Sequence, residues 1–133
     1  MKKHLIVLAI ASTCFAMSSA NAMSKEEYNA GKQKIEADYK AAKAQCDTMK
    51  DNAKDVCMKQ AKGTEDVAKA ELEAQYKPSP AHTRKVAEEK AEMNYQVAKE
   101  KCDDQKGDAK NACVDQAKAA HAKDKADIKA MKS

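Results

Sequence analysis

Apolar side chains recur at intervals of three or four residues through most of the chain after residue 22. This rhythm places them on one face of a helix that packs along a narrow seam. In the first such helix the seam positions are Ile35, Tyr39, Ala42, Cys46 and Met49. In the next they are Cys57, Ala61, Thr64, Ala68 and Leu72. The pattern therefore predicts amphipathic helices that share thin, Ala-rich seams.

The same pattern occurs twice along the chain. Displacing the sequence by 56 residues aligns residues 39–62 with 95–118, and twelve of the 24 aligned positions are identical, both cysteines of each copy among them. A tandem duplication of this kind means that each copy is one structural unit. Tyr39 and Tyr95 occupy one position of the repeat, and we expect them to be the packing anchors of the two units.

Turn-forming residues divide the chain into four helices. The prolines of "KPSP" at 77–80 separate the two copies, because proline lacks an amide donor and disfavours helix in the residue before it. In the second copy, Gly107 suits a helix end and Asp108 suits the N-cap of the next helix. Asp51 and Asn52 hold these places in the first copy. We predict helices near residues 25–49, 53–76, 81–105 and 109–130.

These elements predict an all-α protein made of tandem α-hairpins. The hairpins cover residues 23–76 and 81–133, and residues 77–80 link them. Composition agrees, because Ala, Lys, Glu, Asp and Gln mostly favour helix, while strand-forming residues are scarce. Four such helices can form either a four-helix bundle or an elongated, coiled-coil-like arrangement. Since a buried Ala removes little apolar area from water, each hairpin needs a further source of stability.

The first 22 residues have the features of a secretory signal peptide. Lys2 and Lys3 precede the apolar run "LIVLAIA", and "ANA" at 20–22 has the small-x-small pattern of a cleavage site. The run is too short to span a bilayer, which takes about 20 apolar residues. We therefore predict a periplasmic or secreted protein that begins after Ala22. Without Lys2 and Lys3 the chain has 23 basic and 21 acidic side chains, a net charge of +2. A charge so close to neutral does not indicate nucleic-acid binding.

Four cysteines remain after this segment, in the two stretches "CDTMKDNAKDVC" and "CDDQKGDAKNAC". An even set in an exported chain indicates two disulfides. An unbroken helix through a gap of this length would separate its cysteines by about 16 Å, whereas a disulfide needs Cα atoms within about 7 Å. Two unbroken antiparallel helices could instead bond Cys46 to Cys113 and Cys57 to Cys102, as in the twin Cx9C hairpins, which this spacing resembles.

If the chain turns inside each gap, the disulfides are local. Cys46 then bonds to Cys57, and Cys102 bonds to Cys113. The turn-forming residues within the gaps favour this pairing, and so does the duplication, because an ancestral single copy needed its own bridge. A short loop closed in this way contributes up to about 3 kcal/mol of stability in a chain-entropy estimate. We predict the local pairing, with the disulfides acting as staples.

Other candidate chemistry is sparse. Zinc sites usually bring cysteines two to four residues apart, and redox enzymes usually use Cys-x-x-Cys; neither spacing occurs here. His82 and His121 stand alone in polar surroundings, without a second ligand three or four residues away. No Gly-rich phosphate loop and no set of Ser, His and Asp is present. We predict no enzyme activity, no catalytic residue, and no metal or other cofactor.

The segments "ADYKAAKAQCD", "NAKDVC" and "VAKAELEAQYKPSP", with the second copy "NYQVAKEKCDD" and "GDAKNACVDQAKAA", resemble a group of small exported Ala/Lys-rich proteins of Gram-negative bacteria. These relatives are labelled TolA-like or cell-envelope biogenesis proteins. The resemblance covers essentially the whole chain. A fainter similarity is to the phosphate-starvation PsiF repeat, which is also tandem and exported and has "KGDAK"-like turns before a Cys. The resemblance implies a helical envelope protein and brings no catalytic residues.

Together these features predict a non-enzymatic structural or interaction protein of the cell envelope. The thin seams favour self-association or binding of an envelope protein, without nucleic acid and without stable membrane insertion. The alternative is a small stress protein that binds a ligand or an anionic polymer through Lys-rich helix faces, among them the tail from Lys118. Salt separates the two functions, because charge-driven binding weakens steeply as salt is added and seam packing does not.

Overall fold

The computed structural model of the protein describes residues 22–131, so all but the last residue of the predicted signal peptide lies outside the described part. The elements are α1 (Lys25–Cys46), α2 (Asp51–Tyr76), α3 (Pro80–Lys101), a short 3₁₀ turn η1 (Cys102–Asp104) and α4 (Gly107–Ala130). No strand occurs within residues 22–131. The predicted all-α fold of two disulfide-stapled hairpins is confirmed.

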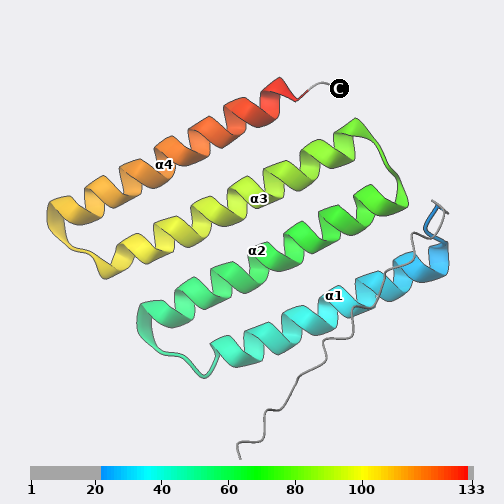
Figure 1. Ribbon diagram of the computed structural model, residues 1–133. Coiled ribbons are helices and arrows are strands. Elements are labelled where there is room, and N and C mark those ends of the chain that lie inside the picture. Colours follow the sequence, from blue (N-terminus) through cyan, green and yellow to red (C-terminus); the bar gives the residue numbers. More distant parts are fainter. Residues whose placement is uncertain (1–21, 132–133) are drawn as a thin grey trace, which may run out of the picture.

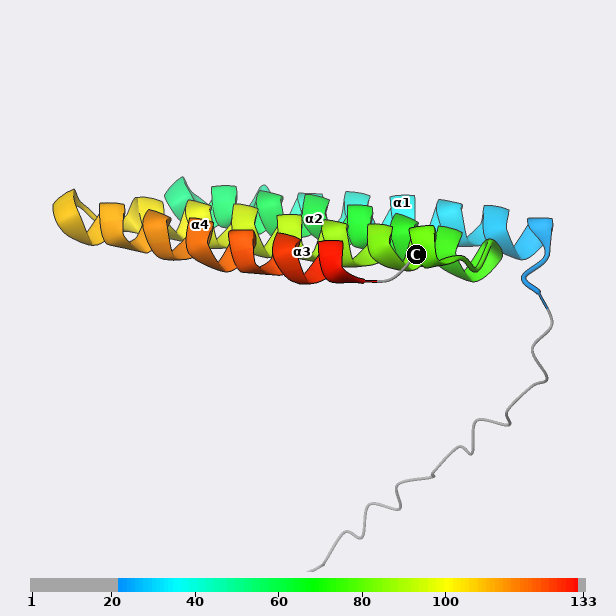
Figure 2. The ribbon, with the colours of Figure 1, turned by 90° about the horizontal axis from the view of Figure 1, so that it is seen from above.

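The four helices lie side by side in one layer. Each runs antiparallel to the one before it, and the order across the layer is the order along the chain (Figure 1). Seen edge-on, the four helices form a single thin layer (Figure 2). The extensive contacts join α1 to α2, α2 to α3 and α3 to α4. Of the two arrangements open to the sequence, the structure has the elongated one, and both broad faces of the layer meet solvent.

Side-chain caps start the first helix of each hairpin. Ser24 Oγ accepts a hydrogen bond from the Glu27 amide at 3.1 Å, and the Ser24 amide donates to Glu27 Oε2 at 2.7 Å, which completes a capping box. The backbone amide of Ser24 holds the pKa of the Glu27 carboxyl below its usual value. In the "KPSP" link, Ser79 Oγ accepts from the His82 amide at 3.1 Å and Pro80 is the first residue of α3.

The turns inside the cysteine gaps differ from the prediction. α1 ends at Cys46 and α3 at Lys101, three to four residues earlier than expected. Gly107 does not end the third helix; it is the first residue of α4, with a left-handed φ of 57°, and Asp108 is not an N-cap. Asp51 holds the same repeat position at the start of α2 with a φ of 50°. The chain needs these extra turn residues because it must reverse fully within the gap for the cysteines to meet.

The hairpins dock through the close contact of α2 with α3. Met93 fills the space above Gly63, where an added Cβ would lie 2.2 Å from Met93 Cγ. Gln60 Nε2 and Thr64 Oγ1 flank the sulfur at 3.7 and 3.9 Å. Val97 is buried on the same helix as Met93. Because Gly63 of α2 has no side chain, the large side chain of Met93 of α3 fits against it.

Polar contacts fix the docking at other levels of the same interface. Asn52 Nδ2 donates to the Glu100 carbonyl at 2.9 Å, and Lys90 Nζ lies 2.7 Å from Glu71 Oε1. Together with the Met93 contact, these interactions span the C-terminal half of α3. The two hairpins therefore form one body.

Substitutions at the left-handed turn position test the turn geometry. An added Cβ at Gly107 would meet no heavy atom within 4 Å, so Gly107→Ala changes only the backbone energy. We expect it to lower the free energy of unfolding by about 1 kcal/mol. Asp51→Gly should raise that free energy by a few tenths of a kcal/mol, because glycine relieves the left-handed strain in part. Urea unfolding followed by circular dichroism measures both, and an unchanged Gly107→Ala variant would contradict the turn.

A second substitution tests the docking of the hairpins. Ala favours helix over Gly by about 1 kcal/mol, yet Gly63→Ala should lower the free energy of unfolding by about 1–2 kcal/mol because its Cβ collides with Met93. In the double variant Gly63→Ala/Met93→Ala, the loss in free energy of unfolding should be smaller than the sum of the losses in the two single variants, because the collision is removed. Gly31→Ala is the matched control: its Cβ would approach only the flexible end of Leu72, 2.7 Å from Cδ1, and should cost less. A stabilised Gly63→Ala variant would show that the hairpins do not dock at this residue.

Candidate functional site

Each hairpin is closed at its turn by a local disulfide. Cys46 bonds to Cys57 with Cα atoms 5.4 Å apart, and Cys102 bonds to Cys113 with Cα atoms 5.6 Å apart. The turns that they close, between α1 and α2 and between α3 and α4, lie at the same end of the layer (Figure 1). Cys46 and Cys102 are 1% and 0% exposed, so one sulfur of each bond is shielded from solvent. This is the local pairing favoured by the sequence, in a setting that suits a staple.

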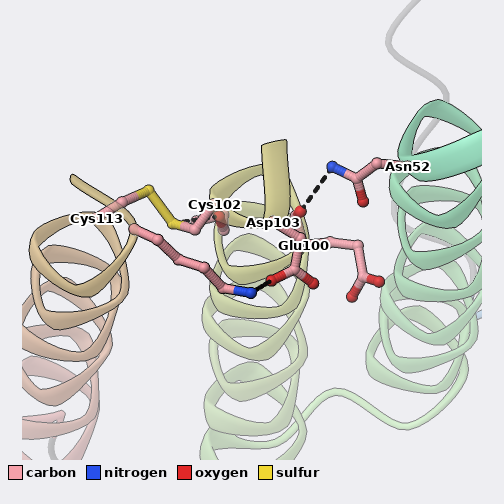
Figure 3. Close-up of a disulfide and its surroundings, with 7 residues drawn as sticks. Asn52, Glu100, Cys102, Asp103 and Cys113 are labelled. Carbon is pink, nitrogen blue, oxygen red and sulfur yellow. Dashed lines mark hydrogen bonds and ion pairs between the residues drawn. A yellow bond between two sulfur atoms is a disulfide. The ribbon is translucent and has the colours of Figure 1, made fainter. Parts of the chain in front are cut away.

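The surroundings of the two disulfides repeat as well. Lys54 Nζ lies 3.0 Å from Asp47 Oδ1 across the first turn, and Lys110 Nζ lies 2.8 Å from Asp103 Oδ1 across the second. Figure 3 shows the second turn, with the disulfide, Asp103 and the hydrogen bond from Asn52 to Glu100 that ties it to the first hairpin. These ion pairs are half exposed and worth little alone. Because both copies of the repeat have this ion pair beside the disulfide, the stapled turn is a part of the structure that the two copies share.

The two repeat tyrosines have different partners. Tyr95 stacks on His121 of α4, with ring centroids 4.6 Å apart. In the first hairpin the residue equivalent to His121 is Glu65, and Tyr39 is half-buried beside it without an aromatic partner. Tyr95 therefore packs across its hairpin in a way that Tyr39 does not.

Glu65 is a buried carboxylate with two lysine partners. Its Oε1 lies 2.6 Å from Lys69 Nζ, and its Oε2 lies 3.4 Å from Lys62 Nζ. Burial alone would raise the pKa of the Glu65 carboxyl, but the hydrogen bonds from Lys69 and Lys62 outweigh it, and the pKa is lowered. The group is a satisfied ion cluster on the seam, which leaves Tyr39 only partly covered.

A second aromatic stack, which the sequence analysis did not identify, closes the far end of the first hairpin. Tyr28 and Tyr76 stack with centroids 4.3 Å apart, and Tyr28 Oη donates to Glu73 Oε2 at 2.5 Å. That hydrogen bond raises the pKa of the Tyr28 phenol. A signal was available, because Tyr28 precedes Cys46 by 18 residues and Tyr76 follows Cys57 by 19. Nearly equal distances on the two sides of a stapled turn bring residues together in an antiparallel hairpin.

The seam between α1 and α2 is open on one face of the layer. We call this hollow the α1–α2 groove; its volume is about 470 Å³, and its apolar lining is Ile35, Tyr39, Ala42, Met49, Val56 and Ala68. Met49 is 43% exposed and is the one large apolar side chain classed as exposed within residues 22–131. The groove exists because a single layer places nothing above the seam and because its middle positions are alanines.

The second hairpin has no equivalent surface. The residues in the places of Ile35, Met49, Val56 and Ala68 are three that are small or polar and one acid, namely Ala91, Gln105, Ala112 and Asp124. The stacking of Tyr95 on His121 also fills its seam. The apolar surface therefore belongs to the first hairpin alone.

On the other side of the α1–α2 seam the surface is charged. Three of its five lysines pair with acids, among them Lys40 Nζ with Glu36 Oε1 at 3.1 Å and Lys85 Nζ with Glu89 Oε1 at 2.6 Å. The hydrogen bond from each lysine to its acid raises the pKa of Lys62 and Lys85. The Lys-rich helix faces are therefore balanced in part by acids.

Neither a metal-binding cluster nor a membrane-spanning helix occurs within residues 22–131. No group of three or more His, Cys, Asp or Glu side chains within residues 22–131 is placed to hold a metal ion. His82 contacts the Lys77 carbonyl through Nδ1 in the first turn of α3, while His121 lies against Tyr95. Among the described helices, none combines the length and apolar character needed to cross a bilayer.

Comparisons with known proteins give no relative. No protein-family model, no curated protein and no solved structure matches the chain. The resemblance to exported TolA-like proteins and to PsiF repeats therefore stays a prediction.

Peptide mapping tests the disulfide pairing. Trypsin should cut on both sides of each cysteine and inside each gap, so each cysteine lies on its own peptide. Without reduction, we expect AQCDTMK (44–50) linked to DVCMK (55–59), and CDDQK (102–106) linked to NACVDQAK (111–118), as mass spectrometry would detect. A link between AQCDTMK and NACVDQAK would establish the crossed pairing instead.

Proposed function

We propose that this protein is a non-enzymatic interaction module of the cell envelope that binds a helical partner in the α1–α2 groove. The observation that carries the proposal is an apolar seam between two helices that no other part of residues 22–131 covers. Contiguous apolar surface on a small protein is characteristic of binding sites. A groove between two antiparallel helices suits the apolar face of a third helix, as in helix-in-groove recognition.

Two features support export to the envelope. Local disulfides such as Cys46–Cys57 persist in oxidising compartments, of which the periplasm is one. Residues 1–22 also have the pattern of a signal peptide, and the resemblance to exported envelope proteins agrees with it. On this proposal the stapled turns keep a marginal helical layer folded outside the cytoplasm.

The alternative function, binding of a ligand or anionic polymer through lysines, has less support. Several lysines on these helix faces pair with acids three or four residues away, as in the pairs Lys34–Asp38 and Lys123–Asp127. The net charge of the chain after residue 22 is only +2. A surface with paired charges attracts a polyanion weakly, whereas the α1–α2 groove offers contiguous apolar area.

Photo-crosslinking in cells tests the proposed function. A photoreactive amino acid at Met49, in the groove, should form adducts of discrete mass, and one at Ala122, exposed on α4, should not. Ala53→Glu should abolish the Met49 adducts, because it places a charge in the apolar groove while a carboxylate in the first turn of α2 suits the helix. The adducts should survive added salt, which screens charge-driven contacts.

The second hairpin provides the matched control. Ala109 holds the place of Ala53 in the first turn of α4, is exposed and lies outside the groove, so Ala109→Glu should leave the adducts intact. Circular dichroism should show equal helix content in both variants. Absence of adducts at Met49 would contradict the proposed function, and adducts that salt removes would favour the polymer-binding alternative.

A further inference from the structure

We propose that Met49 is a modification site at which a peroxide converts the thioether to the sulfoxide, and that the sulfoxide closes the α1–α2 groove to its partner. This inference rests on the proposed function, because it takes the groove to be a binding surface. Three features support it: the exposure of Met49, the disulfide state of the cysteines, and the residue that the second copy of the repeat has at the same position.

Met49 lies in the turn that joins α1 to α2, at the edge of the groove. Its backbone amide donates to the Cys46 carbonyl at 3.0 Å, which holds the residue beside the disulfide, and the residue is 43% exposed. Met58 and Met93, in α2 and α3, are half-buried, and Met93 packs against Gly63. Because a peroxide must reach the sulfur to oxidise it, Met49 is the first of these three methionines to react.

The cysteines do not compete for the oxidant. All four cysteines within residues 22–131 are joined in disulfides, Cys46 to Cys57 and Cys102 to Cys113. A methionine thioether is then the side chain that a peroxide oxidises next. The oxygen–oxygen bond of hydrogen peroxide breaks, one oxygen atom bonds to Met49 Sδ, and the other leaves as water. The sulfur gives up two electrons, which a thiol-dependent sulfoxide reductase can return.

The sulfoxide places a strong hydrogen-bond acceptor in an apolar lining. Met49 lines the groove together with Ala42, Ala53 and Val56, whose side chains have no polar atom. A partner helix that docks there buries the sulfoxide oxygen without a hydrogen bond from these side chains, which lowers the affinity about tenfold. A bound partner also covers Met49, so the peroxide acts on grooves that hold no partner.

The second copy of the repeat has a polar side chain at this position. Gln105 is the equivalent of Met49, and the hairpin that contains it has no comparable apolar surface. Glutamine has the length of methionine and a polar group near the place of the sulfur, as the sulfoxide does. Met49→Gln is therefore a stable substitute for the oxidised residue. Met49→Leu keeps an apolar side chain of similar volume that a peroxide does not oxidise.

Peroxide treatment of the purified, disulfide-bonded chain from residue 23 tests the reactivity of the site. After reduction of the disulfides and digestion with trypsin, the three methionines lie on separate peptides, AQCDTMK (44–50), DVCMK (55–59) and AEMNYQVAK (91–99). By mass spectrometry, sulfoxide should form in the first peptide at least about threefold faster than in the other two. Equal rates, or faster oxidation of Met58 or Met93, would overturn Met49 as the modification site and leave the proposed function standing.

Photo-crosslinking at Gln45 tests the effect of oxidation on binding. Gln45 is exposed and lines the groove, so a photoreactive amino acid there allows Met49 to be varied. Met49→Gln should lower the yield of adducts about tenfold, and Met49→Leu should leave it unchanged. Peroxide treatment of the cells should reduce the yield with Met49 present and not in the Met49→Leu variant. Circular dichroism should show equal helix content in both variants.

The controls separate the oxidation switch from the proposed function. Adducts that survive Met49→Gln, or that peroxide removes equally from the Met49→Leu variant, would overturn the switch and leave the proposed function standing. Absence of adducts from both Gln45 and Met49 before any oxidation would overturn the proposed function, and the switch with it.

Discussion

Each α-hairpin is closed at its turn by a disulfide, and the register of its two helices follows from that bond. The seams themselves bury mostly alanine, so they supply little apolar area with which to hold one helix against the other. Cys46 and Cys102 are the two described side chains that are almost completely buried. With the cysteines joined, residues equally far from the turn come to the same level, which is how Tyr28 reaches Tyr76 at the opposite end.

Two stapled hairpins in tandem produce a layer, and the layer produces the exposed seam. In a bundle, each seam would be covered by the opposite pair of helices. Here the second hairpin docks beside the first through Gly63 and Met93, so the broad faces remain uncovered. The docking contact that makes one body out of two repeats is therefore also the reason that the α1–α2 groove faces solvent.

The two copies have diverged in what they place on this exposed seam. The second hairpin has Tyr95 stacked on His121 and small or polar residues around it. The first has Glu65 held by lysines, a half-buried Tyr39 and the apolar side chains of the groove. Their stapled turns, by contrast, keep the same disulfide, the same Lys–Asp ion pair and a left-handed residue at the same repeat position. This division suggests a shared structural role for the turns and a separate binding role for the first hairpin.

The number and type of the elements and the local cysteine pairing could be predicted from the sequence, because they depend on short-range periodicity, turn residues and spacing. The predicted ends of the first and third helices lie three to four residues too far into the turns. In the third helix the reason is that Gly107, in left-handed conformation, begins the next helix and does not end this one. The choice between a layer and a bundle could not be predicted in the same way. The same apolar rhythm fits both, and the choice depends on which helix meets the space above Gly63. The sequence prediction also treated Tyr39 and Tyr95 alike, because they hold one position of the repeat. In the structure Tyr95 stacks on His121 across its hairpin, whereas Tyr39 lines an open groove.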